Sequence, residues 1–383
     1  MRITARYPFR RLLLALSLLV GTIPVFAQSA PATAKVQTGR PEFDRLVAAV
    51  RADGSMPGIA ALGFRDGQWW ASAQGVRRLG SVDKIRIDDR FHIGSNIKSM
   101  TATVIAELVE RRRLRWDSTL GAIFPDVPMH PAYRRVTLEQ LLQHRAGIVP
   151  LSGLAEIAEV PVFRGGASAQ RQAFARWALA LPPATAPGTF GYSNGGYSVA
   201  GAIIERASGM PYETAMQHYL FKPLGMNAKF GWPAAVDPNQ PWGHADVEGN
   251  GVQVVTAPDD PRFLFPLWLR PAGDLSVNIA DYAKYVMLHA EAGCGRPRLL
   301  SAASFRRLHA VPVSTDGEAY SMGWSEFTAA NGVTFAFHSG SGGNFYATVA
   351  YDSRCERGIA IFSNSGTEPA AIATETAALE WMK

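Results

Sequence analysis

Strand-like segments occur at both ends of this chain, and a long, mostly helical region separates them. Near the N-terminus, apolar runs over 58–64 and 68–76 flank Arg65-Asp66-Gly67, a sequence typical of a hairpin turn. Helical spacing of apolar residues predicts a first helix over 41–52 and a closing helix over 369–382. Further strand-like segments precede the closing helix, at 322–327, 333–338, 344–351 and 358–362. Strands from both ends can pair in one antiparallel sheet, covered by the first and last helices. The sequence therefore predicts an α+β fold with a second, mostly helical lobe over about 110–275.

Ser95 and Lys98 are three residues apart at the predicted start of a helix, directly after the short apolar segment 91–93. Residues at i and i+3 share one helical face, so the amine lies one turn from the hydroxyl. A serine hydroxyl becomes a nucleophile when a base takes its proton, and a lysine whose pKa is lowered by burial is such a base. Ser-x-x-Lys also occurs by chance in many helices, so the rest of the chain has to support a catalytic interpretation.

A second motif, Tyr192-x-Asn194, follows a Pro-Gly-Thr turn at the head of another predicted helix. A tyrosine phenol can relay a proton between Lys98, Ser95 and a leaving group. An asparagine amide can donate to a substrate carbonyl and accept from Lys98. The motif therefore supplies the proton relay and the substrate contact that a Ser–Lys pair lacks.

A third motif, His338-Ser339-Gly340-Ser341, ends a predicted strand. A glycine there lets a substrate backbone lie close to the strand edge. The backbone N–H of Ser341 is then a candidate oxyanion donor beside that of Ser95.

The three motifs, in this order, resemble those of the penicilloyl-serine hydrolase superfamily, which includes serine β-lactamases, penicillin-binding proteins, D-stereospecific peptidases and related esterases. The sequence is most similar to class C-type, β-lactamase-related serine hydrolases, from about residue 41 to 383. Segments 136–148, 187–201 and 221–226 also match the pattern. The resemblance implies a β-lactamase/transpeptidase-like fold, a small-molecule or peptide substrate, and no cofactor.

The resemblance also implies a role for each motif residue. Ser95 is the expected acylated nucleophile, Lys98 the base that activates it, and Tyr192 a partner in the proton transfers. The N–H groups of Ser95 and Ser341 are the expected oxyanion hole. The expected substrate-binding residues come from the second and third motifs: Asn194, His338, Ser339, Gly340 and Ser341.

His338 departs from the pattern of β-lactamases and transpeptidases, which usually have lysine at this position. A lysine is a fixed cation for a substrate carboxylate, whereas the charge of a histidine depends on pH. The sequence therefore favours a peptidase or a carboxylesterase, as near equals, over a β-lactamase or a penicillin-binding protein-like enzyme. A non-catalytic binding or sensor domain of the same fold is the remaining alternative.

The first 27 residues carry the signature of a secretory signal peptide. Four arginines precede an apolar run over 12–20, and Val25-Phe26-Ala27 offers a cleavage site after Ala27. The run is short for a transmembrane anchor, the alternative interpretation. We therefore expect a signal peptide over 1–27, a disordered leader over 28–40, a catalytic domain over 41–383, and a secreted or periplasmic protein with no stable membrane span. The sequence does not indicate an oligomeric state.

Charge and cysteine content agree with an exported enzyme. Removing the four arginines of the signal peptide from the formal charge of +6 leaves +2, which does not indicate nucleic-acid binding. The two cysteines, Cys294 and Cys355, favour a disulfide in an oxidising compartment over two unpaired thiols.

A few other polar and aromatic residues are weaker candidates for function. His244, Asp246 and Glu248 alternate along a predicted hairpin, but one short segment is thin evidence, and no metal is expected. His144 is expected to have a structural role. Trp324 lies near the third motif in the sequence and is a candidate for substrate contact.

Overall fold

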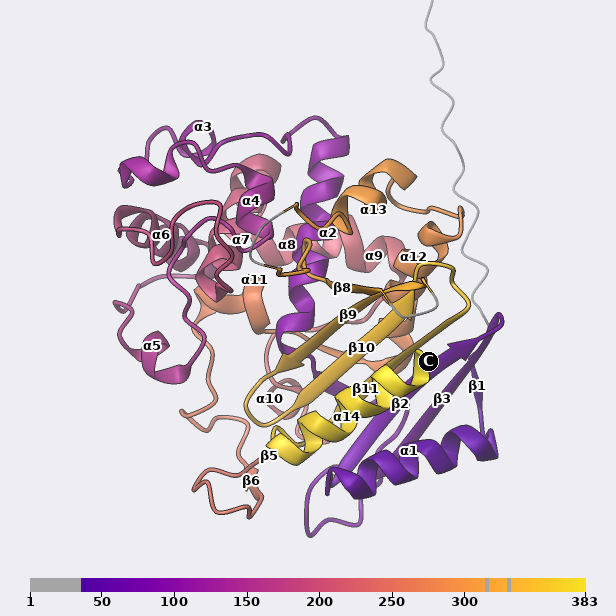
Figure 1. The fold of residues 1–383 in the computed structure, drawn as a ribbon. Helices are drawn as coiled ribbons and strands as arrows, with labels where there is room; N and C mark the ends of the chain where they lie inside the picture. The colour runs from indigo at the N-terminus through magenta and orange to yellow at the C-terminus, as the bar shows by residue number, and fades with distance from the viewer. Residues whose placement is uncertain (1–35, 314–316, 329–331) are drawn as a thin grey trace, which may run out of the picture. The chain divides into compact units, whose positions relative to one another are not determined.

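A seven-stranded sheet forms the centre of the computed structural model, which describes residues 36–313, 317–328 and 332–383 (Figure 1). Its strand order is β1-β3-β2-β11-β10-β9-β8, and every neighbouring pair is antiparallel except β1 with β3. The strands are β1 (Gln37–Thr38), β2 (Gly58–Arg65), β3 (Gln68–Gly75), β8 (Ser325–Thr328), β9 (Thr334–Ser341), β10 (Tyr346–Asp352) and β11 (Arg357–Ser363).

The two ends of the chain meet in the middle of this sheet, as predicted. β2 pairs with β11 from Ile59 to Arg65, with Leu62 opposite Ala360. β2 and β3 are joined by a two-residue turn in which Asp66 and Gly67 both have positive φ, the backbone that such tight hairpins require. Two smaller antiparallel pairs lie outside the sheet: β4 (Arg90–His92) with β7 (Ser276–Asn278), and β5 (Gly243–Ala245) with β6 (Val254–Thr256).

The end of the expected leader differs from the prediction. Residues 28–40 were expected to have no regular structure, but Gln37 and Thr38 add a parallel edge strand beside Trp70 and Ala71 of β3. Backbone pairing with an existing strand orders two polar residues whose side chains give no strand pattern. Residues 1–35, which hold the predicted signal peptide and most of the leader, lie outside the described part of the chain.

The helices fall between the two groups of strands, with α1 and α14 at the ends. They are α1 (Pro41–Asp53), α2 (Ile97–Glu110), α3 (Leu120–Ile123), α4 (Leu138–Leu142), α5 (Leu154–Ala158), α6 (Ala167–Ala180), α7 (Asn194–Ser208), α8 (Tyr212–Met216), α9 (Lys222–Leu224), α10 (Pro233–Val236), α11 (Arg270–Gly273), α12 (Ile279–Gly293), α13 (Ala302–Leu308) and α14 (Glu368–Trp381). The predicted helical middle is therefore present, and it includes α5, in a stretch whose sequence shows no clear period.

Helices cover both faces of the sheet. α1 and α14 pack on one face, where their apolar residues meet β2, β3, β10 and β11 in a buried cluster that includes Phe43, Ile59 and Ile361 (Figure 1). α12 packs against β2, β10 and β11, and α7 packs against α2, α4, α6 and α11. The turn that begins α2 touches β9 and β10, so this helix connects the sheet with the helical lobe.

Within the three described ranges, no helix has the length and apolar character that crossing a bilayer requires.

Candidate active site

Ser95 lies in a tight turn between β4 and α2. The chain leaves β4, passes through Gly94 with a φ of 50°, and forms a 3₁₀ turn over Gly94–Asn96 before α2 begins. The Asn96 side chain holds this turn against the sheet, since its Nδ2 donates to Ile93 O and to Ala347 O of β10, both at 3.1 Å. The predicted helix start after a short buried strand is therefore present, and packing fixes the Ser95 turn against β9 and β10.

Lys98 is buried one turn after Ser95. Its side chain is 0% exposed, and its Nζ lies 2.8 Å from Ser95 Oγ and donates to Ala272 O at 2.6 Å. The ring centroids of Tyr192 and Tyr197 are 4.9 and 5.7 Å from the same nitrogen. Burial lowers the pKa of Lys98 well below its usual value, because removal from water disfavours the charged form. The arrangement can therefore move a proton from the serine to a neutral amine.

Tyr192 lies two residues ahead of α7 and interacts with Ser95. Burial raises the pKa of the phenol to about 12, although its interaction with the Ser95 side chain opposes the rise. The next residue, Ser193, caps α7: its Oγ accepts from Gly196 N at 2.8 Å and donates to Val149 O at 2.7 Å. The cap holds the backbone beside Tyr192 in place, and the raised pKa keeps the phenol protonated at neutral pH.

Asn194 begins α7 and lies beside Ser95 on one cavity wall. Its Nδ2 donates to Leu151 O at 2.8 Å, which orients the amide. The sequence predicted that this amide would accept from Lys98, whereas the hydrogen bonds of the Lys98 amine go to Ser95 and Ala272. The amide nitrogen carries two protons, so the bond to Leu151 leaves one for the predicted donation to a substrate carbonyl.

The end of β9 passes directly beside Ser95. Gly342 N donates to Phe345 O just before β10. Backbone N–H groups point to alternate sides of a strand, so the N–H of Gly340, two residues earlier, also points toward β10. The amides of Ser339 and Ser341 then face the opposite edge, beyond the last β9 residue that β8 pairs, Phe337. The Ser341 N–H therefore has the orientation that an oxyanion donor needs.

His338 is buried near the end of β9, and its Nε2 lies 3.2 Å from the hydroxyl oxygen of Tyr320. Burial and the nearby Lys98 lower the pKa of His338 to about 3, so the ring is neutral at neutral pH. Tyr320 has no motif around it that could have marked it in the sequence.

His144 is a second site residue whose position the sequence did not reveal. It follows α4 with a φ of 58°, is buried, and accepts at Nδ1 from Ser193 N at 3.1 Å. Its ring packs on those of Tyr192 and Tyr320, with centroids 4.3 and 4.7 Å away. These contacts agree with the expected structural role of His144. The part of the chain that His144 stabilises is the turn that carries Tyr192.

Two cavities are lined by residues of the three motifs. One, of about 260 Å³, is lined by Ser95, Asn194 and Ser341 together with Ile157, Phe265 and Leu269. The other, of about 450 Å³, is lined by Phe190, Tyr192, Tyr320, His338 and Ser339. Ser95 and Tyr192 therefore each face open space that substrate groups can enter.

Two weaker candidates lie outside this site. His244 is buried, with Nδ1 2.7 Å from Asn364 O and Nε2 accepting from Leu79 N, so both ring nitrogens are occupied by backbone groups. The expectation that Trp324 contacts substrate is wrong: its side chain is fully buried among the rings of Tyr285, His289 and Tyr351. Nearness to the third motif in sequence did not place it on the cavity side of the sheet.

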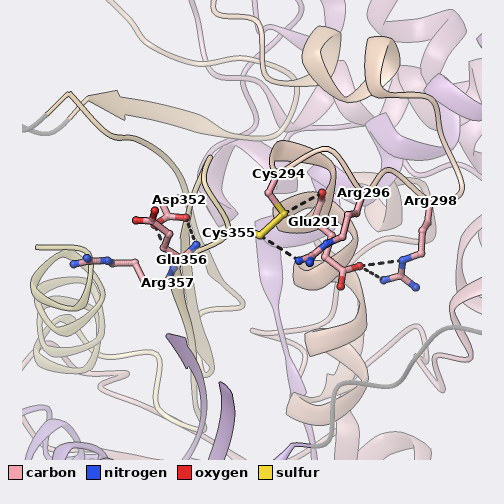
Figure 2. Close-up of a disulfide and its surroundings, with 8 residues drawn as sticks. All are labelled: Glu291, Cys294, Arg296, Arg298, Asp352, Cys355, Glu356 and Arg357. Atoms are coloured by element: carbon pink, nitrogen blue, oxygen red, sulfur yellow. Dashed lines mark hydrogen bonds and ion pairs between the residues drawn. A yellow bond between two sulfur atoms is a disulfide. The ribbon is translucent and has the colours of Figure 1, made fainter. Parts of the chain in front are cut away.

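Cys294 and Cys355 are joined by a disulfide with a Cα–Cα distance of 5.8 Å (Figure 2). The bond connects the end of α12 to the turn between β10 and β11. This turn follows Asp352, the last residue of β10, whereas Tyr346, which pairs with Ser341, is the first.

Two proteins of known name are similar to this chain in sequence. Penicillin-binding protein 4 of Amycolatopsis lactamdurans is 28% identical over 67% of this chain and 66% of its own length. Unguisins hydrolase ungD of Aspergillus violaceofuscus is 26% identical over 85% of this chain and 61% of its own length. The chain therefore spans less than two thirds of the length of each.

The solved structure of an octameric penicillin-binding protein homologue from Pyrococcus abyssi superposes with a TM-score of 0.71, at 26% identity, over 89% of this chain and 77% of that one. This confirms the predicted fold. The sequence model of the family described as Beta-lactamase matches residues 43–380. The chain therefore belongs to the beta-lactamase family of serine hydrolases.

Proposed function

We propose that this protein is an exported serine hydrolase that cleaves ester or amide bonds through an acyl-enzyme on Ser95. The observation that carries the proposal is the contact between Lys98 Nζ and Ser95 Oγ, at 2.8 Å, with the lysine fully buried. An amine held uncharged by burial is a competent base for a serine hydroxyl. The basic and apolar N-terminal sequence supports export.

In the acylation step, Ser95 Oγ attacks the substrate carbonyl carbon while Lys98 takes the hydroxyl proton. The negative charge then resides on the carbonyl oxygen, which the backbone N–H groups of Ser95 and Ser341 stabilise. Collapse of this intermediate breaks the bond to the leaving group, and Tyr192 delivers a proton to that group and regains one from Lys98. Water attacks the acyl-enzyme by the same steps, releases the acid and restores Ser95.

A peptidase and a carboxylesterase remain the leading substrate classes. The name of the Aspergillus relative describes it as a hydrolase of unguisins, which supports hydrolysis as the reaction type. A β-lactam-recognising enzyme is the second candidate, because another relative is named a penicillin-binding protein. The neutral His338 in place of a lysine favours the first two classes.

Labelling with a fluorescent fluorophosphonate tests the proposal, because the reagent phosphonylates activated serines. We expect the wild-type protein to be labelled on the peptide that contains Ser95 and Ser95→Ala not to be labelled. Ser99→Ala is the matched control: Ser99 lies one turn further along α2, is buried, and donates to Asn96 O. Failure of the folded wild-type protein to label would reject the acyl-enzyme and favour a binding or sensor domain.

A substrate panel then separates the classes. p-Nitrophenyl esters, D-alanyl peptides and nitrocefin are compared by kcat/KM with the wild-type protein. Turnover of nitrocefin above both other classes would favour the β-lactam alternative.

A further inference from the structure

A chain of ion pairs runs through the helical lobe and ends beside the Ser95 turn. Glu213 of α8 pairs with Arg270 of α11 at 3.2 Å. Arg270 Nε in turn donates to Asp274 Oδ2 at 3.3 Å. Asp274 Oδ1 lies 3.3 Å from Nε2 of His92, the last residue of β4. The ion pairs therefore lead to a histidine three residues before the proposed nucleophile.

His92 is fully buried, and both of its ring nitrogens are hydrogen-bonded. Gly94 N donates to Nδ1 at 3.4 Å, so Nδ1 must hold a lone pair. The ring proton is then on Nε2, where it is donated to the Asp274 carboxylate. Asp274 Oδ1 also accepts from Gly231 N at 2.9 Å, which fixes the carboxylate. Asp274 thus orients the ring, and the ring orients the backbone amide that begins the Ser95 turn.

The same ring lies against the end of the third motif. A methyl group on the Cα of Gly342 would lie 2.8 Å from His92 Nδ1 and 2.6 Å from the Trp232 ring. The rings of His92 and Trp232 pack together, with centroids 3.9 Å apart. Gly342 directly follows Ser341, so His92 contacts the chain next to each expected oxyanion donor. A shift of His92 would therefore move the amides of Ser95 and Ser341 relative to each other.

Asp274 is also connected to the proposed base. It directly follows α11, and the carbonyl of Ala272, two residues earlier, accepts from Lys98 Nζ at 2.6 Å. Arg270, the first residue of α11, donates to the same carboxylate, so Asp274 fixes both ends of this short helix. The carbonyl that holds the Lys98 amine is therefore held in place by the carboxylate that orients His92.

We infer, on the basis of the proposed acyl-enzyme chemistry, that Asp274 and His92 act as one positioning pair for acylation. They align the Ser95 hydroxyl with the Lys98 amine and with the two backbone N–H donors. Neither is among the described residues that line the two cavities, so the pair acts without touching substrate. Loss of the pair should therefore slow acylation and leave substrate binding unchanged.

Single-turnover acylation by a p-nitrophenyl ester, at a range of enzyme concentrations, measures the maximal rate and the half-saturating concentration separately. We expect Asp274→Ala to lower the maximal rate by about 10²-fold, the loss that a misplacement of about 1 Å can cause, with the half-saturating concentration unchanged. Asp274→Asn keeps an oxygen that can accept from His92, so it should recover most of the lost rate. A wild-type maximal rate in folded Asp274→Ala, or a change in the half-saturating concentration alone, would overturn the inference.

A double-mutant cycle tests whether the two residues act together. His92→Leu removes the other partner and should also slow acylation. Because each residue acts largely through the other, the combined loss in the double variant should be much smaller than the product of the two single losses. Single losses that multiply in the double variant would show two independent structural effects and would overturn the inference.

Asp281→Ala is the matched control for Asp274→Ala. Asp281 is a buried carboxylate that accepts from Asn227 N at 3.0 Å and pairs with Lys284 at 2.5 Å, but it lines neither cavity. Both substitutions should lower stability in urea unfolding, because each leaves a backbone N–H and a cation without this acceptor. Only Asp274→Ala should slow acylation. Equal slowing in the two variants would mean general damage and would overturn the inference.

A measurement on the wild-type protein keeps the inference testable if the Asp274 variants do not fold. Long-range ¹H–¹⁵N correlation spectra distinguish Nε2–H from Nδ1–H histidines, and His92→Gln, which retains a donor toward Asp274, assigns the signal. We expect a neutral Nε2–H ring for His92. An Nδ1–H ring, or a ring protonated on both nitrogens at neutral pH, would overturn the inference even if Ser95 is acylated. Absence of fluorophosphonate labelling in the folded wild-type protein would instead reject the proposed function beneath it.

Discussion

Gly340 and Ser95 are in direct backbone contact. A methyl group on the Cα of Gly340 would lie 2.7 Å from Ser95 N and 2.2 Å from Ile93 O. Glycine is required here for space, because both neighbouring atoms belong to backbone that Asn96 holds against β10. This contact between the third motif and the serine turn places the Ser341 amide beside Ser95.

Gly340→Ala should therefore impair acylation of Ser95. The added methyl group must push β9 away from the serine turn and displace one oxyanion donor, a loss that typically costs about 10²–10³-fold in rate. The rate of fluorophosphonate labelling measures the effect, and circular dichroism confirms folding. Gly166→Ala is the control, because its φ of −72° suits alanine and nothing lies within 4 Å of the new methyl group. A folded Gly340→Ala protein that labels at the wild-type rate would contradict this account.

Removing the Lys98 amine should abolish most activity while the fold remains. A general base contributes about 10²–10⁴-fold, so Lys98→Ala should label at Ser95 more slowly by that factor. Single-turnover acylation with a chromogenic ester gives the same comparison without the later steps. A folded Lys98→Ala protein with normal acylation would exclude Lys98 as the base.

The pH dependence of acylation tests the protonation state of the same amine. Because burial lowers the pKa of Lys98 well below 10.5, the neutral form persists at much lower pH than for a free lysine. The acylation rate should rise with pH and reach its plateau well below pH 10.5. Lys98→Arg, whose guanidinium stays charged, should show no such rise. A midpoint near 10.5 in the wild-type protein would mean that the amine is charged at neutral pH.

Local patterns in the sequence were enough to predict the main elements of the fold. The β2–β3 hairpin was predicted from a short turn between two apolar runs, and α1 begins at residue 41, as predicted. β1 was not predicted, because Gln37 and Thr38 become a strand only through pairing with β3. α5 was missed for a similar reason, since its residues lack a helical period.

The contacts inside the site were less predictable than its motifs. The Ser95–Lys98 contact follows from i, i+3 spacing on a helix, so local geometry predicts it. Ala272 and Tyr320 reach the site from distant parts of the chain, and no spacing rule connects them to Ser95. His144 stood in a recognisable segment, but only the fold brings its ring onto Tyr192.

Buried neutral histidines should make the protein sensitive to acid. Burial lowers the pKa of His338 to about 3 and that of His244 to about 4, from the usual 6.5 of a histidine. Below pH 6.5 these histidines bind protons in the unfolded chain but stay neutral in the folded protein. They therefore destabilise the fold increasingly as the pH falls toward their pKa values in the folded protein. Each such histidine lowers the free energy of unfolding by about 1.4 kcal/mol per pH unit in that window.

Urea unfolding between pH 7 and pH 4.5 measures this slope. Carboxylates also titrate in this range, so the His338→Gln variant isolates one contribution. Its slope should be smaller than the wild-type slope by about 1.4 kcal/mol per pH unit. Equal slopes in the two proteins would show that His338 is protonated in the folded state.

The Cys294–Cys355 disulfide should contribute stability without affecting the site. It closes a loop with a sequence separation of 61, for which the chain-entropy model gives about 4 kcal/mol, and measured effects are commonly about 2–4 kcal/mol. A protein with both Cys294→Ser and Cys355→Ser should lose stability by that amount in urea unfolding.

Reduction of the wild-type protein is the matched control for that variant. Dithiothreitol should lower the wild-type stability to that of the double variant and leave the double variant unchanged. Labelling of Ser95 should proceed at the same rate in all of these samples. Cys355 lies beyond Asp352 (Figure 2), and Asp352 is at the opposite end of β10 from Tyr346, which pairs with Ser341. A double variant as stable as the oxidised protein would contradict the prediction. It would mean that the disulfide adds no stability to the end of α12 and the β10–β11 turn, which it connects.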